Sequence, residues 1–389
     1  MHPKRKRTQQ NAAAGGIALL VLLAGLLLLF GTPRPGMLDT GQYDLILPQL
    51  GLSRGDVYTQ AEYYTRPNEL FAIDSMPWSG LLQVTSAPAL VYPASLVSAV
   101  CGLFGQSFST VCLAVLLLLL LSAAIFVLTK SLYALFGGLG MFFGGIYSAG
   151  ILCGNYLLYL NSLYPTAMFL VALTAFAAAV FRGWALLRQP ETHGVSVWLP
   201  AALCSLLLLT ASEFSIVLLL PVVISVAVLG FRTAKRSPRF ACRTACVVLA
   251  VLALTFCSVR FTAQNAQEFN KTNLYHSFFD GVLLAADDPE QVLTDFDMDT
   301  GLTADIGKSA YLSEDAYYIS PNGDRANEIF DHLSYTHIVT YYASHPAALL
   351  RLTGQILPQA GHVDTARCVA VDDASPLTRA DYWDLLRRF

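Results

Sequence analysis

Long runs of apolar residues, separated by short polar segments, fill the first two thirds of the chain. Because about 20 helical residues cross a hydrocarbon core about 30 Å thick, runs of this length predict membrane-spanning helices. A continuous apolar stretch at 132–181 is longer than one crossing needs. The other runs predict helices at residues 15–32, 86–104, 108–130, 196–212, 214–231 and 244–261.

The composition agrees with a chain whose main solvent is lipid. Of the 389 residues, 55% are hydrophobic and 13% are charged, whereas soluble globular chains carry roughly a quarter charged residues. The fold class that follows is an all-α polytopic membrane protein in contact with the lipid bilayer.

Charge divides the polar segments into two groups. Residues 4–7, the loop that holds Arg182, Arg188 and Glu191, and residues 232–243 carry eleven Lys/Arg (four, two and five) against one acid, whereas residues 263–389 carry nineteen acids against eight Lys/Arg. By the positive-inside rule, segments rich in Lys and Arg stay in the cytoplasm. The protein is therefore predicted to lie in the cell (cytoplasmic) membrane, with its N-terminus inside and its C-terminal segment outside.

These positions constrain the number of crossings in the apolar stretch 132–181. If the three preceding helices leave the chain outside near Lys130, the stretch must cross an odd number of times to bring Arg182 inside. One crossing with a re-entrant piece and three short helices both satisfy this condition. Seven glycines between residues 137 and 154 favour three short, closely packed helices that form a cavity wall, since glycine permits close backbone approach.

The polar segments divide the chain into five parts. Residues 1–14 form a basic cytoplasmic N-terminus, 15–32 a transmembrane anchor, 33–85 the first outer loop, 86–261 a multi-helix transmembrane region and 262–389 an outer C-terminal segment. A cleaved signal peptide is the alternative for the first helix, and an anchor is favoured because no small-residue cleavage site follows it. Pro-bounded amphipathic pieces predict interfacial helices in the first loop, and stretches such as Asn327 to Tyr342 predict a small, mainly helical C-terminal segment.

Cysteine and histidine spacing predicts neither a disulfide nor a metal site. Seven of the eight cysteines fall in apolar or basic segments, which leaves Cys368 without a pair outside the membrane. No nucleotide-binding loop and no Ser or Cys nucleophile motif is present. The basic runs lie at helix ends, where topology explains them without nucleic acid.

Carboxylates close to the membrane boundary are the candidates for chemistry. Asp39 and Asp44 follow the first apolar run by seven and twelve residues. A carboxylate there could serve as general base for an acceptor hydroxyl or as ligand to a cation on a donor phosphate, and a loop cap or turn residue is the alternative. Glu213 between two apolar runs and Arg260 at the end of the last helix are further candidates, with a solvated turn and snorkelling as their alternatives.

Three segments carry a family resemblance. Thr40-Gly-Gln-Tyr-Asp-Leu-Ile-Leu-Pro-Gln-Leu-Gly-Leu52 resembles the Asn-Gly-Asp-Phe-x-Arg-x-Met-x-x-x-Gly-Leu segment after the first helix of bacterial glycan biosynthesis hexose transferases of the GT-C type. Tyr159-Leu-Asn-Ser-Leu-Tyr164 resembles that family's Tyr-Phe-Asn-Ser-Phe-Tyr. Tyr275-His-Ser-Phe-Phe-Asp-Gly-Val-Leu283, with Asp287-Asp-Pro-Glu290 and Gly307-Lys-Ser-Ala-Tyr311, is similar to its outer segment after a late helix.

This resemblance implies a GT-C-like helical bundle that moves a hexose from a polyprenyl-phosphate carrier to a cell-envelope glycan on the outer face. Asp39 or Asp44 would then be catalytic. The resemblance names no cofactor, and a divalent cation on the donor phosphate is compatible with the chemistry. The substrate-binding residues would be Gln42, Tyr43, Asn161, Ser162, Tyr164, Glu213 and Arg260.

The chain departs from the family pattern at Gln42, where the family has an acid, and at Pro165 and Thr166, where it has a Glu. Family members also tend to continue into further helices beyond the position of Phe389, so either a shortened member or a reading frame that ends early is expected. Two other functions stay open. A transporter or flippase for a lipid-linked sugar would need charged or broken helices at the bilayer midplane and an inverted repeat, and the sequence shows neither a repeat nor a midplane charge. The other function is a non-catalytic scaffold subunit of glycan assembly.

Overall fold

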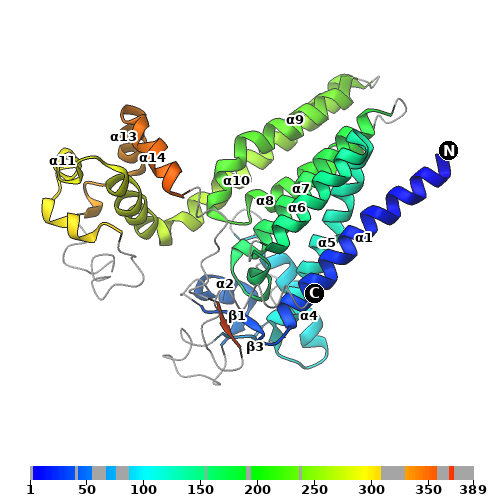
Figure 1. Cartoon of the computed structure of the whole chain (residues 1–389), viewed down its shortest axis with the longest axis horizontal. Coiled ribbons are helices and arrows are strands. Elements are labelled where there is room, and N and C mark those ends of the chain that lie inside the picture. Colours follow the sequence, from blue (N-terminus) through cyan, green and yellow to red (C-terminus); the bar gives the residue numbers. More distant parts are fainter. Residues whose placement is uncertain are drawn as a thin grey trace. The chain divides into compact units, whose positions relative to one another are not determined.

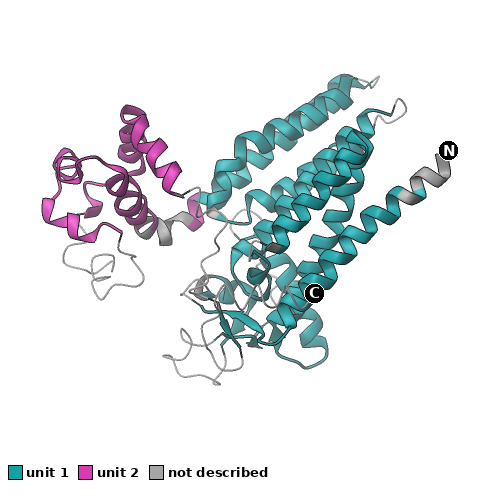
Figure 2. Ribbon diagram, viewed as in Figure 1, with its two compact units in different colours: residues 1–262, 363–389 teal, residues 263–362 magenta. Residues whose placement is uncertain are grey.

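A computed structural model describes the chain at residues 3–39, 43–54, 67–75, 87–153, 156–189, 194–235, 239–307, 329–356 and 368–371. The chain forms two compact units (Figure 2). The first comprises residues 1–262 together with 363–389, and the second comprises residues 263–362.

Helices make up most of the first unit (Figure 1). Within the described ranges, five are long and apolar enough to span a membrane, and three are shorter and apolar, so the predicted all-α polytopic membrane fold is confirmed. The helices of this unit are α1 (Pro3–Phe30), α2 (Tyr43–Leu50), α4 (Val91–Leu103), α5 (Thr110–Phe136), α6 (Gly138–Cys153), η2 (Tyr156–Asn161), α7 (Pro165–Leu187), η3 (Val195–Val197), α8 (Leu199–Leu209), η4 (Glu213–Leu218), α9 (Leu219–Lys235) and α10 (Phe240–His276), which continues into the second unit.

From α5 to α10 the direction of the helices alternates along the chain, so that α5, α7 and α9 run one way and α6, α8 and α10 the other, which gives the first unit two ends. The end of α1 packs against the start of α5, where a Cβ on Gly25 would lie 2.6 Å from Leu118 Cδ1. At the far end of α5, Arg188 donates a 2.7 Å hydrogen bond to the Leu135 carbonyl. Arg232 of α9 also lies there, over the ring of Trp184. This end is named the basic end, and the opposite one, which holds the short strands, the sheet end.

Helix α4 begins and ends at the sheet end. The Ala89 N–H, just before α4, donates to the carbonyl of Thr210 at the end of α8, and Phe108, just after it, pairs with Phe71 in a sheet. Its 13 residues span about 20 Å, less than the hydrocarbon core. The prediction that 86–104 crosses the membrane is therefore wrong.

The apolar stretch 132–181 contains fewer helices than predicted. Helix α5 continues to Phe136, so Lys130 lies near the basic end. The rest of the stretch forms α6, the short η2 and part of α7 instead of three short helices. Gly140 makes the tight α5–α6 turn possible, because a Cβ there would collide with the Leu132 carbonyl. Compared with the prediction, α4 removes one pass and the stretch 132–181 changes the count by one more. The two changes cancel in direction, so α10 still runs away from the basic end, as predicted.

Short strands surround α2 at the sheet end. Strand β1 (Pro35–Met37) pairs antiparallel with β5 (Cys368–Ala370), and β3 (Leu70–Ile73) lies between β2 (Leu52–Ser53) and β4 (Phe108–Ser109). Helix α2 agrees with the helical prediction for the first loop, whereas the strands were not predicted. The predicted pieces at Tyr63 and Trp78 lie outside the described residues.

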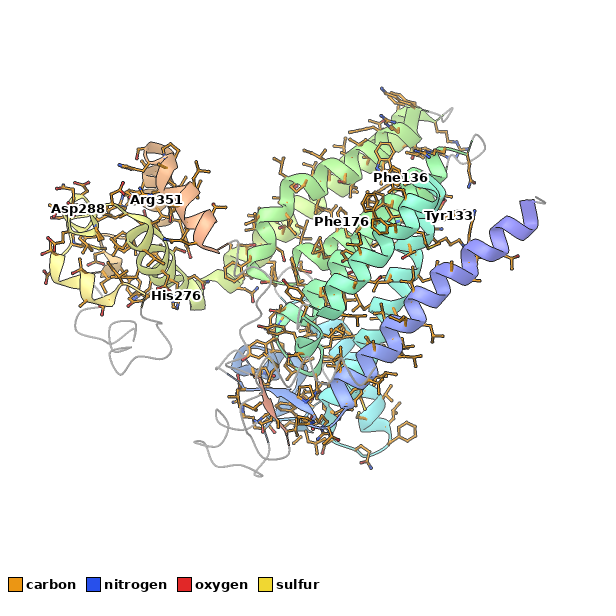
Figure 3. All side chains as sticks on the ribbon, viewed as in Figure 1. Tyr133, Phe136, Phe176, His276, Asp288 and Arg351 are labelled. Carbon is orange, nitrogen blue, oxygen red and sulfur yellow. The ribbon has the colours of Figure 1, made fainter. Side chains whose placement is uncertain are left out.

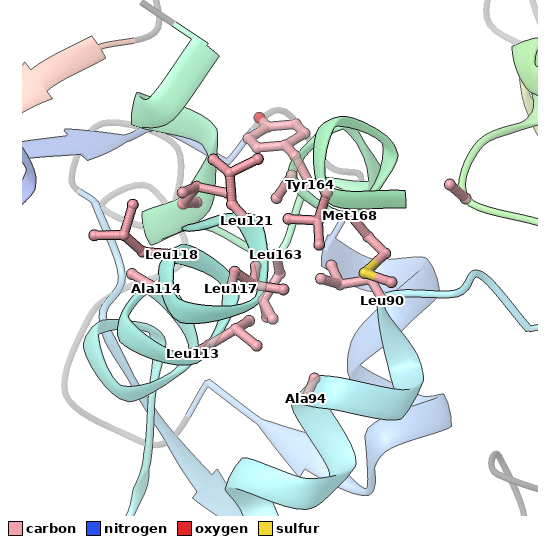
Figure 4. Close-up of a cluster of buried hydrophobic side chains, with 14 of the residues drawn as sticks. Leu90, Ala94, Leu113, Ala114, Leu117, Leu118, Leu121, Leu163, Tyr164 and Met168 are labelled. Atoms are coloured by element: carbon pink, nitrogen blue, oxygen red, sulfur yellow. The ribbon is translucent and has the colours of Figure 1, made fainter. Parts of the chain in front are cut away.

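Helix α5 is the centre of the apolar core (Figure 4). Leu113, Leu117 and Leu121 of α5 are fully buried and lie in one cluster with Leu163 and Met168. Other faces of α5 contact α1, α4 and α6. The core therefore holds the start of α7 against the sheet-end half of α5.

The second unit has its own core of buried Phe278, Phe279, Leu293 and Ile329. Arg351 and Asp287, which are exposed, form an ion pair (Nη2 to Oδ2, 2.7 Å; Figure 3 labels Arg351). The predicted helix at 327–342 is α13, which begins later. After α10, the helices are η5 (Ser277–Leu283), α11 (Pro289–Asp295), η6 (Thr300–Asp305), α13 (Tyr335–Ser344) and α14 (Pro346–Ile356).

Cysteine labelling tests the corrected path. In a cysteine-free background, Gln106→Cys after α4 and Gly138→Cys after α5 are expected to react with a membrane-impermeant maleimide from opposite sides, because α5 separates the two ends. The reagent reaches one face of the membrane in intact cells and the other face in inverted vesicles. Labelling of both positions from one side would contradict the path.

Two glycines of α6 test the packing. Gly140→Ala is expected to destabilise the protein by about 1–3 kcal/mol, the usual cost of forcing atoms into a packed contact. Gly145→Ala, on the same helix with no atom within 4 Å of the new Cβ, is expected to change stability by less than about 0.5 kcal/mol. Thermal unfolding in detergent measures both, and equal effects would contradict the contact.

Candidate functional site

Asn161, the last residue of η2, connects four segments at the sheet end. Its Oδ1 accepts a 3.0 Å hydrogen bond from Thr110 Oγ1, and its Nδ2 donates to Glu69 Oε1 at 3.0 Å and to the Pro35 carbonyl at 3.3 Å. The side chain is 4% exposed. A buried amide with donors and acceptor satisfied fixes the geometry of the groups around it.

Glu69 carries this network to the surface. It pairs with Arg34 (Nη2 to Oε2, 2.7 Å), and the side chains of Arg34 and Glu69 are 35% and 14% exposed. The Glu69 carbonyl also accepts from the Thr110 N–H at 2.9 Å. The partly exposed guanidinium of Arg34 is thus a positioned cation at the sheet end.

Asp39 is held inside the protein rather than presented to solvent. Its residue is 1% exposed, its Oδ2 accepts from Arg54, and its Oδ1 accepts the N–H of Tyr43 at 3.3 Å, at the first turn of α2. A carboxylate that pairs with a cation and accepts the first amide of a helix stabilises local structure. This geometry suits a positioning residue.

Tyrosines pack between these groups. The Tyr164 hydroxyl donates to the Leu38 carbonyl at 2.6 Å, and the ring of Tyr164 meets that of Tyr43 edge to face at 5.3 Å. Ser162 accepts from the Tyr164 N–H at 3.2 Å. Burial, and after it the neighbouring Tyr164, raises the pKa of Tyr43 well above its ordinary value, so its hydroxyl stays neutral.

Five of the predicted site residues therefore come together at the sheet end: Asp39, Tyr43, Asn161, Ser162 and Tyr164. Arg260 is exposed on α10, which contributes no side chain to the contacts above. Gln42 and the side chains of Asp44 and Glu213 lie outside the described part of the structure.

Sequence reasoning missed Arg34, Arg54 and Glu69. A signal for the arginines was present, because residues 33–85 contain only three Lys/Arg in a loop that the positive-inside rule predicts to be poor in cations. Nothing in the spacing indicated that Glu69 would meet Asn161, 92 residues away.

An apolar cavity of about 530 Å³ lies between α6, η2 and α7. Tyr147 and Ile151 of α6 line one side, and Tyr156 of η2 with Phe169 and Leu173 of α7 line the other. The Tyr147 hydroxyl is bonded to Thr174 at 2.7 Å. Helix η2, which ends at Asn161, and α7, which begins just after Tyr164, thus also form walls of the cavity. The same two helices therefore carry both apolar and polar surface.

Metal ligands do not gather in the described ranges: no three His, Cys, Asp or Glu side chains there could hold an ion. The predicted divalent cation stays a prediction.

The family model of the YfdI N-terminal transmembrane domain matches residues 4–356. The chain belongs to this family. The match to the YfdI N-terminal transmembrane domain covers both units and all five long apolar helices, in agreement with a multi-pass membrane protein. No curated protein and no solved structure matches the chain.

The Asp39–Arg54 pair predicts coupled effects on stability. Asp39→Asn alone is expected to destabilise the protein by about 3–5 kcal/mol, because it leaves the Arg54 charge largely buried without its partner. Asp39→Asn combined with Arg54→Gln is expected to cost less than the sum of the single changes, as measured by thermal unfolding in detergent.

The exposed pair of Asp287 and Arg351 supplies the control. Arg351→Gln should cost less than about 1 kcal/mol, as for other surface ion pairs. Additive effects of the two changes at Asp39 and Arg54 would contradict the pairing.

Proposed function

We propose that the protein is a GT-C-type glycosyltransferase that moves a hexose from a polyprenyl-phosphate carrier to a cell-envelope glycan. The observation that carries the proposal is the shared wall described above: η2 and the start of α7 border an apolar cavity and hold a polar cluster. A donor with an isoprenoid chain and a charged sugar phosphate needs both kinds of surface on one element. The resemblance of residues 40–52 and 159–164 to hexose transferases supports the same conclusion.

The sheet end is proposed to face the outside of the cell membrane. The basic end carries the Lys/Arg-rich segments, which the positive-inside rule assigns to the cytoplasm. With this orientation, Arg34 and Glu69 lie on the outer side, where an acceptor glycan would be reached.

Arg34 is proposed to bind the donor phosphate. A guanidinium matches phosphate oxygens in geometry and charge, and this one is partly exposed while Glu69 orients it. Arg54 is less exposed and is committed to Asp39. The two arginines therefore divide into one that contacts substrate and one that supports the loop.

Asp44, in the first turn of α2, is proposed as the general base. Asp39 is proposed to position that helix by accepting the N–H of Tyr43. The acceptor hydroxyl oxygen bonds to the anomeric carbon of the hexose as the bond from that carbon to the phosphate oxygen breaks. The hydroxyl proton passes to the Asp44 carboxylate, and polyprenyl phosphate leaves. A divalent cation on that phosphate would stabilise the leaving charge.

Transfer by the protein in liposomes tests this assignment. With a panel of radiolabelled polyprenyl-phosphate hexoses and cell-envelope glycan as acceptor, Asp44→Asn is expected to lower kcat by about 100-fold or more, the usual contribution of a general base. Arg34→Gln is expected mainly to raise KM for the donor. Asp74→Asn, at an exposed position of the same loop, is the matched control and should retain activity.

Three outcomes would overturn the proposal. Unaltered transfer by the Asp44→Asn variant would show that Asp44 is not the general base. Movement of the labelled lipid across the vesicle membrane without transfer would indicate a flippase, and inactivity of the wild-type protein with every donor would favour a scaffold.

A further inference from the structure

A second cavity, of about 860 Å³, lies at the basic end, between the ends of α5, α7 and α9. Its walls include Phe136, Phe181 and Trp184, and two cations, Arg188 and Arg232, complete it (Figure 3 labels Phe136). Aromatic rings and aliphatic side chains thus surround a pair of guanidinium groups.

Both guanidinium groups are held in place in ways that leave donors available. Arg188 uses Nη1 to reach the Leu135 carbonyl at 2.7 Å. Arg232 lies over the ring of Trp184, with Cζ 4.8 Å from the ring centre. A guanidinium over an aromatic ring makes that contact with its flat face. Its N–H groups lie in the plane of the guanidinium and therefore stay available to a ligand.

Neither arginine is neutralised by a carboxylate in the described part of the chain. No ion pair to Arg188 or Arg232 is found there. Between residues 75 and 262 the sequence contains two acids, Glu191 and Glu213, against nine Lys/Arg. The field at this cavity therefore favours an anion.

We infer that this cavity binds the phosphodiester headgroup of an anionic phospholipid. Basic pockets between membrane helices bind such headgroups, Arg pairs phosphate oxygens at two points, and Trp184 suits the interface between headgroups and acyl chains. The apolar side chains of α5 and α7 provide contact for the start of the acyl chains. A zwitterionic lipid fits less well, because its own cation meets the two arginines.

Lipid retention tests the inference. In native mass spectrometry of the full chain released from nanodiscs of mixed phosphatidylglycerol and phosphatidylcholine, wild-type protein is expected to retain phosphatidylglycerol preferentially. Arg188→Gln with Arg232→Gln should weaken this retention roughly 25-fold, since each arginine at a membrane surface contributes a factor of about five.

Arg182→Gln is the matched control, because Arg182 is exposed on the same helix but does not line the cavity. It should retain phosphatidylglycerol as the wild type does. Thermal unfolding in detergent without lipid should show a cooperative transition for every variant, with only a small shift for the double variant, which loses the Leu135 hydrogen bond and the Trp184 contact. This measurement separates lost binding from misfolding.

Equal retention of phosphatidylglycerol by the double variant and the wild type would overturn the inference, as would equal retention of the two lipids by the wild type. Stabilisation by millimolar inorganic phosphate or glycerol phosphate, without a further effect of phosphatidylglycerol, would assign the cavity to a soluble anion and likewise overturn it.

Discussion

Hydrogen-bond satisfaction in lipid is the constraint on which the structure depends. A helix satisfies its own backbone, so the chain passes between the two ends of the first unit as helices. At the sheet end the backbone leaves the helical path, and side chains supply the missing partners: Asn161 donates to the Pro35 carbonyl, and Tyr164 to that of Leu38. The polar cluster is thus required by the fold as well as suited to a ligand.

Which helix ends lie together could be predicted from sequence, because basic residues mark those ends. Basic residues at 182–243 meet at one end in the structure, as expected. The number of passes could not be predicted, because apolarity alone does not distinguish α4, whose residues cover the sheet end, from a spanning helix. The error at α4 and the extra helix expected in 132–181 offset each other, and the predicted direction of α10 survived.

Part of the site could be predicted because it lies in short motifs. Asp39, Tyr43, Asn161 and Tyr164 were chosen from local segments and do converge. The partners that define their chemistry are distant in sequence, as with Asp39 and Arg54 or Asn161 and Glu69, and no periodicity relates them. Asp39 consequently looked like an exposed base in the sequence, although the structure encloses it in an ion pair.

The pairing of β1 with β5 has a consequence for the second unit. The chain leaves the first unit along α10 and returns to it at residues 368–370, so the second unit is an insertion anchored at both ends. The second unit is therefore a closed loop, held to the first unit at α10 and at β5. Closing this loop costs conformational entropy, and the pairing of β5 with β1, next to Arg34, offsets that cost. A single protease cut within residues 263–362 would accordingly leave two fragments joined by the β-ladder rather than releasing the unit.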